Sequence, residues 1–306
     1  MKVSLGLPVH HVGADLATAE AIAVASKAAE SGGFDAVYVT DHPMPTTRWL
    51  HGGGHPTLDP FVALSFASAA TTTLRLHMNL LILAYRNPFL SAKGIATLDA
   101  LSRGRLVVGV GAGYLRGEFE ALGVSFDERN ELTDEALEVM REAWKGEDLV
   151  AEGSHWRATG NLLMPVPAQR PGPPVWIGGN SKRAIRRSVE LADGWMPMPS
   201  PAGSERSLKT PAITSVADLA QRIEYAWAHA AVVGRTAPLE IVFMPMGLDM
   251  FSKAGIDADA VVASVRELAE VGVTYLTMEL PGSTLAEFVA NIDDFSRDVL
   301  PLIDKV

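Results

Sequence analysis

An acid and an imidazole stand together at the end of an apolar run, in the stretch GGFDAVYVTDHPMP that spans residues 32–45. The apolar run predicts a buried strand, after which the chain turns polar at Asp41 and His42. An imidazole titrates near neutral pH, so His42 could donate or accept a proton during a reaction. Pro43 cannot continue the strand and fixes the backbone just past the imidazole. Asp41 and His42 are therefore predicted to be catalytic residues.

A second stretch suited to chemistry is GGNSKRAIRRS, which spans residues 178–188. Two glycines end a predicted strand, and Asn180 or Ser181 can cap the helix that follows. Basic residues in the first turn of a helix oppose its dipole unless an anion binds there. The stretch fits a phosphate site, and it equally fits an ordinary strand–helix turn with solvated basic side chains.

Three glycines recur at alternate positions in VGVGAGYLRGEFEALG, namely Gly109, Gly111 and Gly113. Glycine lets a backbone approach a ligand closely, although tight packing inside a barrel explains the same pattern. The carboxylates that follow, Glu118 and Glu120, are predicted to lie at the surface or in a loop.

Histidines also raise the question of a metal centre. His10 and His11 are adjacent, so on a strand they would point to opposite sides. The later strand ends PVWIGG and DGWMPM contain no histidine, so a zinc or two-metal hydrolase would lack ligands and no metal is predicted. The other histidines are predicted to be loop or structural residues: His51, His55, His77, His155 and His229.

The composition limits the classes of partner. The chain has 306 residues and a formal net charge of −10, which argues against nucleic acid or an anionic membrane as the main partner. It has no cysteine, which excludes disulfides and thiolate metal sites, so any redox work needs a bound cofactor. No signal peptide or membrane-spanning run is visible, so a cytoplasmic location is expected.

Short apolar runs alternate with longer amphipathic ones along the chain. The predicted strands are residues 3–9, 34–40, 74–83, 105–111, 173–179, 193–198, 238–247 and 273–280. Parallel strands need helical crossovers, so this alternation predicts a closed (β/α)8 TIM barrel. The alternative is an open doubly wound sheet, but GLPVHHVGADL lacks the glycine fingerprint that usually follows its first strand. A single domain over residues 1–306 is expected, with an insertion at about 147–172 between the fourth helix and the fifth strand.

Three stretches occur in order over the first two thirds of the chain: GFDAVYVTDHP (33–43), the run from RNPFLS to MREAW (86–144), and PPVWIGGNSKRAIRRSVELADGWMPM (173–198). Together they resemble the luciferase-like monooxygenase superfamily, and within it the oxidoreductases that use the deazaflavin coenzyme F420. The last third of the chain resembles the family only in its strand–helix rhythm.

The resemblance implies a cofactor ring lying across the C-terminal mouth of the barrel. A non-proline cis peptide at Asn79–Leu80 would form a bulge behind the ring. The residues implied beside the ring and its ribityl chain are Gly111, Ala112, Gly113 and Tyr114. The residues implied to hold the cofactor phosphate are Gly178, Gly179, Asn180 and Ser181.

The resemblance also assigns roles around the reacting atoms. It places His42 near the reactive ring carbon, with Asp41 either orienting His42 or hydrogen-bonding the ring. Trp49 and Trp195 would form walls of the substrate pocket. One branch of the family has a glutamate where Tyr114 stands here, which argues against a sugar-phosphate substrate.

The expected activity is hydride transfer between coenzyme F420 and a small organic substrate, with His42 supplying or accepting the proton. An FMN-dependent monooxygenase on the same scaffold is the nearest alternative, since both cofactors offer a tricyclic ring and a phosphate. A protein that binds the cofactor without catalysis is a second alternative. The resemblance implies a homodimer.

Overall fold

Eight parallel strands close into a barrel in the order β1-β10-β9-β8-β7-β4-β3-β2 in the computed structural model, which describes residues 1–8, 15–248 and 256–305. The predicted (β/α)8 TIM barrel is confirmed. The strands are β1 (Lys2–Gly6), β2 (Ala36–Val39), β3 (Arg75–Ile82), β4 (Leu106–Gly111), β7 (Val175–Gly178), β8 (Gly194–Met196), β9 (Glu240–Phe243) and β10 (Tyr275–Met278).

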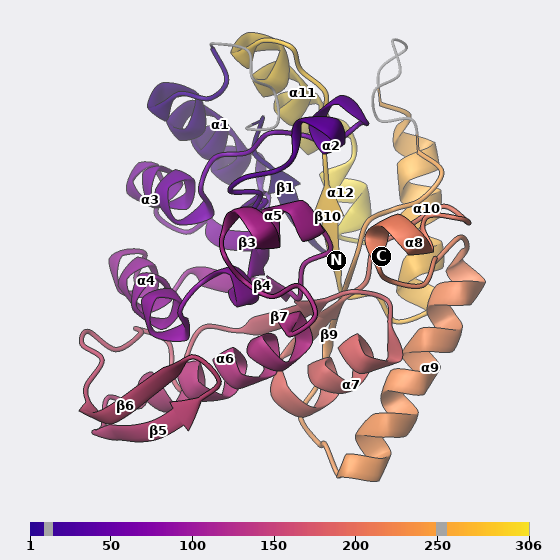
Figure 1. Cartoon of the computed structure of the whole chain (residues 1–306). Helices are drawn as coiled ribbons and strands as arrows, with labels where there is room; N and C mark the ends of the chain where they lie inside the picture. The colour runs from indigo at the N-terminus through magenta and orange to yellow at the C-terminus, as the bar shows by residue number, and fades with distance from the viewer. Residues whose placement is uncertain (9–14, 249–255, 306) are drawn as a thin grey trace.

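Helices surround this barrel and connect its strands (Figure 1). The side chains of Thr18, Asp59 and Asn87 each cap a helix by accepting a backbone N–H of its first turn. Pro60 and Pro88 follow two of these caps, where the missing N–H is tolerated. The long helices are α1 (Ala19–Gly32), α3 (Pro60–Ala70), α4 (Pro88–Leu101), α6 (Arg129–Ala143), α7 (Lys182–Leu191), α9 (Val216–Val233), α10 (Ala258–Glu270) and α11 (Leu285–Asp298).

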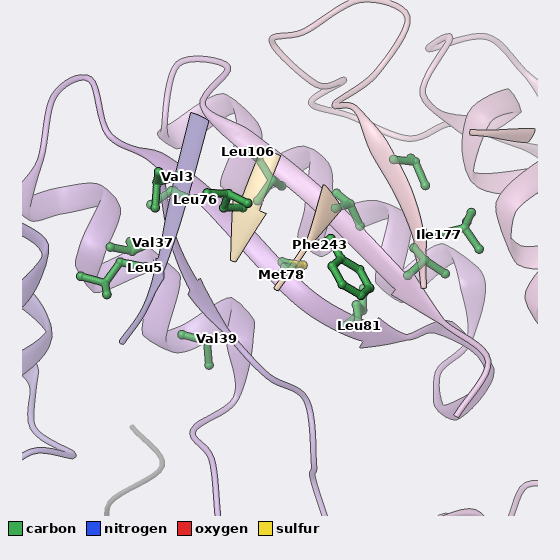
Figure 2. Packing of buried hydrophobic residues seen from close by; sticks show 14 of the residues in the cluster. Val3, Leu5, Val37, Val39, Leu76, Met78, Leu81, Leu106, Ile177 and Phe243 are labelled. Carbon is green, nitrogen blue, oxygen red and sulfur yellow. The ribbon is translucent and has the colours of Figure 1, made fainter. Parts of the chain in front are cut away.

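The strands bury one set of side chains against the helices. Alternate residues of a strand point to opposite faces, so every second residue contributes to this outer core. Burial of such side chains is the main favourable term in folding. Figure 2 labels several members of the cluster: Val3, Leu5, Val37, Val39, Leu76, Met78, Leu81, Leu106, Ile177 and Phe243.

The other set fills the inside of the barrel with rings. The His77 and Trp176 rings lie 4.9 Å apart, as do those of Trp176 and Tyr275. Nδ1 of His77 is 3.2 Å from Oγ of Ser4. Full burial, with the charge of Arg75, lowers the pKa of His77 to about 3. His77 is thus a neutral packing residue below the barrel mouth.

Short additional elements extend the connections. A 3-10 turn (Leu83–Tyr85) follows β3. An antiparallel hairpin of β5 (Leu149–Gly153) and β6 (Trp156–Asn161) falls within the expected insertion and lies beside α6 in Figure 1. The short helices are α2 (Thr47–His51), α5 (Arg116–Ala121), α8 (Glu205–Leu208) and α12 (Leu300–Ile303). None of the helices in the described ranges is long and apolar enough to cross a membrane.

Candidate active site

The candidate site lies where the C-terminal ends of the barrel strands meet, which is where catalytic residues gather in this fold. His42 follows β2, and the connection continues into α2; the connection after β4 continues into α5. The two connections touch, because a Cβ built on Gly117 would lie only 2.4 Å from Cγ2 of Thr46. Figure 1 shows α2 and α5 near each other at one end of the barrel.

A buried carboxylate lies behind His42. Oε2 of Glu118 is 3.3 Å from Nδ1 of His42 and accepts a hydrogen bond from the Tyr85 hydroxyl over 2.7 Å. Its Oε1 accepts the backbone N–H of Met44 over 3.3 Å. Glu118 is fully buried, so the prediction that it lies at the surface or in a loop is wrong. The charge of Glu118, added to the effect of burial, raises the pKa of Tyr85 above its usual range.

Asp41 does not orient His42, contrary to one of the two predicted roles. Its carboxylate accepts hydrogen bonds from both terminal nitrogens of Arg86, over 2.6 and 2.9 Å, and from the backbone N–H of Ile82, over 3.1 Å. A bidentate Arg–carboxylate pair is a strong and directional contact. Burial lowers the pKa of Arg86, but Asp41 more than offsets it and holds that pKa above its ordinary value. Asp41 therefore fastens the chain behind the imidazole.

Aromatic rings surround His42 on its other sides. Ring centroids lie 4.6 Å away for Trp49, 5.2 Å for His55 and 6.1 Å for Tyr114. Burial and repulsion from His42 lower the pKa of His55, and burial with the charge of Glu118 raises the pKa of Tyr114 to about 12. Trp49 thus lies beside His42, as expected of a pocket residue, and His55, which lies in a loop as predicted, joins the cluster.

The floor of the mouth is formed around Leu80. The predicted cis peptide at Asn79–Leu80 is confirmed, and the β3–β4 pairing shifts register between Met78 and Leu81. Asn79 and Leu80 are half-buried, so part of each faces open space.

The strand glycines make room for this floor. A Cβ on Gly178 would lie 2.3 Å from Cδ1 of Leu80, and one on Gly111 would lie 3.1 Å from the same atom. Both glycines are buried and accommodate Leu80, whereas Gly111 was predicted to lie beside the ring and Gly178 to hold the phosphate. Ala112 and Gly113 are half-buried at the rim, Gly113 with a φ of 80°.

Asn180 has a structural role in place of the predicted contact with a phosphate. Its side-chain nitrogen donates to the carbonyls of Met198 and Pro211, and its side-chain oxygen accepts the Met198 N–H, each over 2.9 Å. Its own N–H donates to the Thr210 hydroxyl, and its carbonyl accepts from Arg222. The side chain and N–H of Asn180 therefore hold the segment after β8 against the start of α7, and its carbonyl joins that turn to Arg222 of α9.

The start of α7 retains fewer groups for an anion than the sequence indicates. The Ser181 hydroxyl caps the helix by accepting the Ala184 N–H over 3.2 Å. Arg183 pairs with Glu131 and Asp134 of α6, at 3.0 and 2.9 Å, which offsets its unfavourable place at the helix start. Gly179, with a φ of 111°, and the exposed Lys182 remain at the turn.

Trp195 is not a pocket wall. Its side chain is fully buried in the core outside the barrel, and Nε1 donates to the carbonyl of Gly179 over 2.9 Å. Strand alternation explains the error, because Gly194 and Met196 take the inward positions of β8. His10 and His11 lie outside the described residues.

Few features of the sequence indicate that Glu118, Tyr85 and Arg86 belong to the site. The one available signal was Asp41 itself, because an acid at the end of a buried strand requires a basic partner.

His155 and His229 do have partners, Glu128 at 3.0 Å and Glu190, both remote in sequence.

The resulting site fits a flat heteroaromatic cofactor. A half-buried leucine supported by glycines gives an apolar floor, Tyr114 and Gly113 lie at its rim, and His42 supplies a group that exchanges protons. The N-terminus of α7, with Lys182, offers backbone N–H groups and one cation for a phosphate.

Two relatives resemble the chain over most of its length. An uncharacterized protein of Mycobacterium tuberculosis is 30% identical over 287 residues, which cover 89% of this chain and 91% of the relative. A protein of Gordonia bronchialis named F420-dependent glucose-6-phosphate dehydrogenase is 26% identical over 322 residues, with coverage of 91% and 92%.

Solved structures share the fold. Monooxygenase RslO1 from Streptomyces bottropensis superposes with a TM-score of 0.80 at 22% identity, covering 98% of this chain and 99% of that one. The oxygenating constituent of 3,6-diketocamphane monooxygenase from Pseudomonas putida, in complex with FMN, gives 0.75 at 16% identity, covering 98% of each chain. These structural likenesses show the fold alone.

A family model described as luciferase-like monooxygenase matches residues 1–238. The relatives and neighbours found include oxidoreductases and monooxygenases, some named for F420 and some solved with FMN or a modified FMN, which supports an oxidoreductase with a deazaflavin or flavin cofactor. The chain belongs to the luciferase-like monooxygenase family.

Proposed function

We propose that this protein is a coenzyme F420-dependent oxidoreductase that transfers a hydride between the deazaflavin and a small organic substrate. The observation that carries the proposal is the position of His42. It follows β2 at the C-terminal end of the barrel, beside the rings of Trp49 and Tyr114, with a buried carboxylate on its Nδ1 side. A hydride transfer to or from an oxygen-bearing carbon needs one such proton-exchanging group.

F420 is favoured over FMN by the relatives. The Gordonia bronchialis protein, which carries F420 in its name, aligns over 91% of this chain. The protein in the FMN complex is only 16% identical to this chain, so its similarity supports the fold alone.

The residues of this chain have separate tasks in the proposed reaction. A bound deazaflavin supplies the ring carbon that gives or receives the hydride. Leu80 and Tyr114 would hold the ring, and the turn at Gly179 and Ser181, with Lys182, would hold the phosphate. When a substrate hydroxyl is oxidised, its proton passes to His42; when a carbonyl is reduced, His42 returns the proton.

Tyr114 bears on the class of substrate. It stands where a sugar-phosphate branch of the family has a glutamate, and its hydroxyl stays protonated because burial and Glu118 raise its pKa to about 12. Tyr114 therefore supplies no negative charge. We propose that the substrate is a small alcohol or carbonyl compound and that glucose 6-phosphate is not oxidised.

The decisive experiment is a parallel fluorescence titration of the purified protein with F420 and FMN, followed by turnover assays. Submicromolar binding of F420 is expected, with reduction of F420 by one or more members of a panel of secondary alcohols and none by glucose 6-phosphate. The His42→Gln variant should bind F420 within about twofold of wild type and lose turnover about 100-fold or more.

Each alternative has its own outcome in these assays. Tight binding of FMN with none of F420 would replace the proposal by an FMN-dependent monooxygenase. Tight F420 binding without turnover for any alcohol, aldehyde or ketone tested would favour a non-catalytic binding protein. Full turnover in His42→Gln would remove His42 from the chemistry.

A further inference from the structure

We propose that Glu118 is the positioning residue of the site, holding the proton of neutral His42 on Nδ1 and so presenting Nε2 as the atom that exchanges a proton with the substrate. This inference rests on the proposed function for its chemical consequence. Its structural content, which nitrogen carries the proton, holds with or without a bound cofactor.

The contact geometry selects one tautomer. A carboxylate only accepts hydrogen bonds, so Oε2 of Glu118, 3.3 Å from Nδ1, is satisfied by His42 only when Nδ1 carries a proton. In neutral imidazole one nitrogen is a donor and the other an acceptor, so the proton on Nδ1 leaves Nε2 as the acceptor. A neutral His42 in this tautomer is ready to take the proton of a substrate hydroxyl.

Glu118 is itself fixed in place. Tyr85 donates to Oε2 over 2.7 Å, and the backbone N–H of Met44 donates to Oε1 over 3.3 Å. The Tyr85 ring packs edge-on against Phe119, the neighbour of Glu118, with centroids 4.7 Å apart. With both oxygens engaged and the side chain fully buried, the carboxylate has little freedom to turn away from the imidazole.

His42 is the basic group that Glu118 faces. Within the described ranges, no lysine or arginine lies within 4.0 Å of its carboxylate, and the basic side chain that contacts it is His42. Burying a carboxylate without a partner is costly, so the imidazole stabilises Glu118 as well as being oriented by it.

The other titratable groups around His42 do not provide a charged partner for its imidazole. His55 contacts the His42 ring edge-on, and its lowered pKa keeps it neutral near neutral pH. Tyr114 is neutral for the opposite reason, because its pKa is raised to about 12. The neighbouring acid Asp41 is engaged by Arg86, at 2.6 Å.

The proton balance of the proposed step then closes at two named atoms. Oxidation of a substrate CH–OH to a carbonyl would release a hydride, for which a bound deazaflavin would be the acceptor, and a proton, which Nε2 of His42 would accept. The imidazolium that results is paired with Glu118 through Nδ1–H, so the new positive charge is neutralised inside the site. Reduction runs the same proton back from Nε2 to the substrate oxygen.

The test reads the tautomer by NMR of ¹⁵N-histidine-labelled protein, above the pH at which the imidazole protonates, with and without F420. In wild type, the His42 signal is expected to show a protonated Nδ1 and an unprotonated Nε2. In Glu118→Gln, whose amide can donate as well as accept, the preference should fall to a mixture or reverse. Glu120 is an exposed carboxylate on the same helix, so the control variant Glu120→Gln should show the same protonation pattern as wild type.

Two further variants keep the inference testable if Glu118→Gln does not fold. Glu118→Asp keeps the charge but withdraws it by one methylene, so the Nδ1–H form should persist in part. Tyr85→Phe keeps the carboxylate, so the Nδ1–H form should persist in full. A wild-type signal protonated on Nε2, or a Glu118→Gln pattern identical to wild type, would overturn the assignment, whereas failure of F420 to bind would overturn only the proposed function.

Discussion

The guanidinium of Arg86 donates from both terminal nitrogens to the carboxylate of Asp41, over 2.6 and 2.9 Å. Asp41 lies two residues after β2, and Arg86 follows the short turn after β3, so the pair joins two neighbouring strand ends. Asp41 also accepts the Ile82 N–H. The acid beside His42 therefore serves the architecture of the mouth, and the carboxylate that contacts the imidazole is that of Glu118.

Replacing Asp41 with asparagine should lower the free energy of unfolding by about 3 kcal/mol, because it leaves the partly buried guanidinium without its counter-charge. Urea denaturation followed by circular dichroism measures the change. Asp59→Asn is the matched control, since Asp59 contacts Arg86 at 3.7 Å with 46% of its side chain exposed. That control should cost less than about 1 kcal/mol; equal losses in the two variants would contradict the assigned role of Asp41.

The pH dependence of stability should carry a contribution from His77. The unfolded chain binds a proton at this histidine below about pH 6.5, whereas the folded protein does so only at about 3. The unfolded state therefore binds more protons in this window, and the free energy of unfolding falls as the pH falls through it. His77→Gln, which keeps an acceptor for Ser4 but does not titrate, should show a flatter decline in urea midpoint between about pH 7 and pH 4. An unchanged slope would show that His77 becomes charged in the folded protein.

The barrel was predictable because its signals are local. Each strand is a short apolar run, and caps such as Asp59 and Asn87 stand directly before their helices. The cis peptide at Asn79–Leu80 was predictable because the resemblance implies one in the third strand. The catalytic role of His42 and the pocket role of Trp49 stay predictions. The role of Glu118 was not, because its burial depends on Tyr85 and on the segment at Met44, both distant in the sequence. The predictions that Trp195 forms a pocket wall and that Asn180 binds a phosphate were wrong for a related reason. Proximity to a glycine turn in the sequence does not determine the direction in which a side chain points.

The pairing of Leu80 with the glycines beneath it predicts how the cofactor floor responds to added volume. In Gly178→Ala, the new Cβ would lie 2.3 Å from Cδ1 of Leu80 and should push that side chain into the mouth. We expect the dissociation constant for F420 to rise about tenfold, as for a modest overpacking cost. In a Leu80→Ala background, the same glycine substitution should change it less than about twofold. Fluorescence titration of wild type, the two single variants and the double variant completes this double-mutant cycle. Equal effects of Gly178→Ala in both backgrounds would contradict the packing argument.

The contact between Thr46 and Gly117 predicts a second coupled pair. Alanine normally favours a helix over glycine, by about 0.5–1 kcal/mol, yet Gly117→Ala should destabilise the protein because its Cβ would lie 2.4 Å from the Thr46 methyl. Thr46→Ser removes that methyl and keeps the hydroxyl that accepts the Trp49 N–H. The double variant should therefore recover the stability lost in Gly117→Ala, as measured by urea denaturation. No recovery would mean that α2 and α5 do not pack against each other in this way.

The hydrogen bonds of Asn180 predict a local opening of the segment that follows β8. Asn180→Ala removes three side-chain bonds to Met198 and Pro211, each worth about 1 kcal/mol. Because these bonds join only that segment to the start of α7, the loss should appear as faster proteolytic cleavage within residues 199–210 more than as a change in global unfolding. Ser181→Ala, which removes the adjacent helix cap at a cost of about 1 kcal/mol, is the control and should leave the cleavage rate close to that of wild type. If Asn180→Ala resists the protease as well as wild type does, the segment is held by other contacts, and Asn180 would again be open to the role of a phosphate ligand.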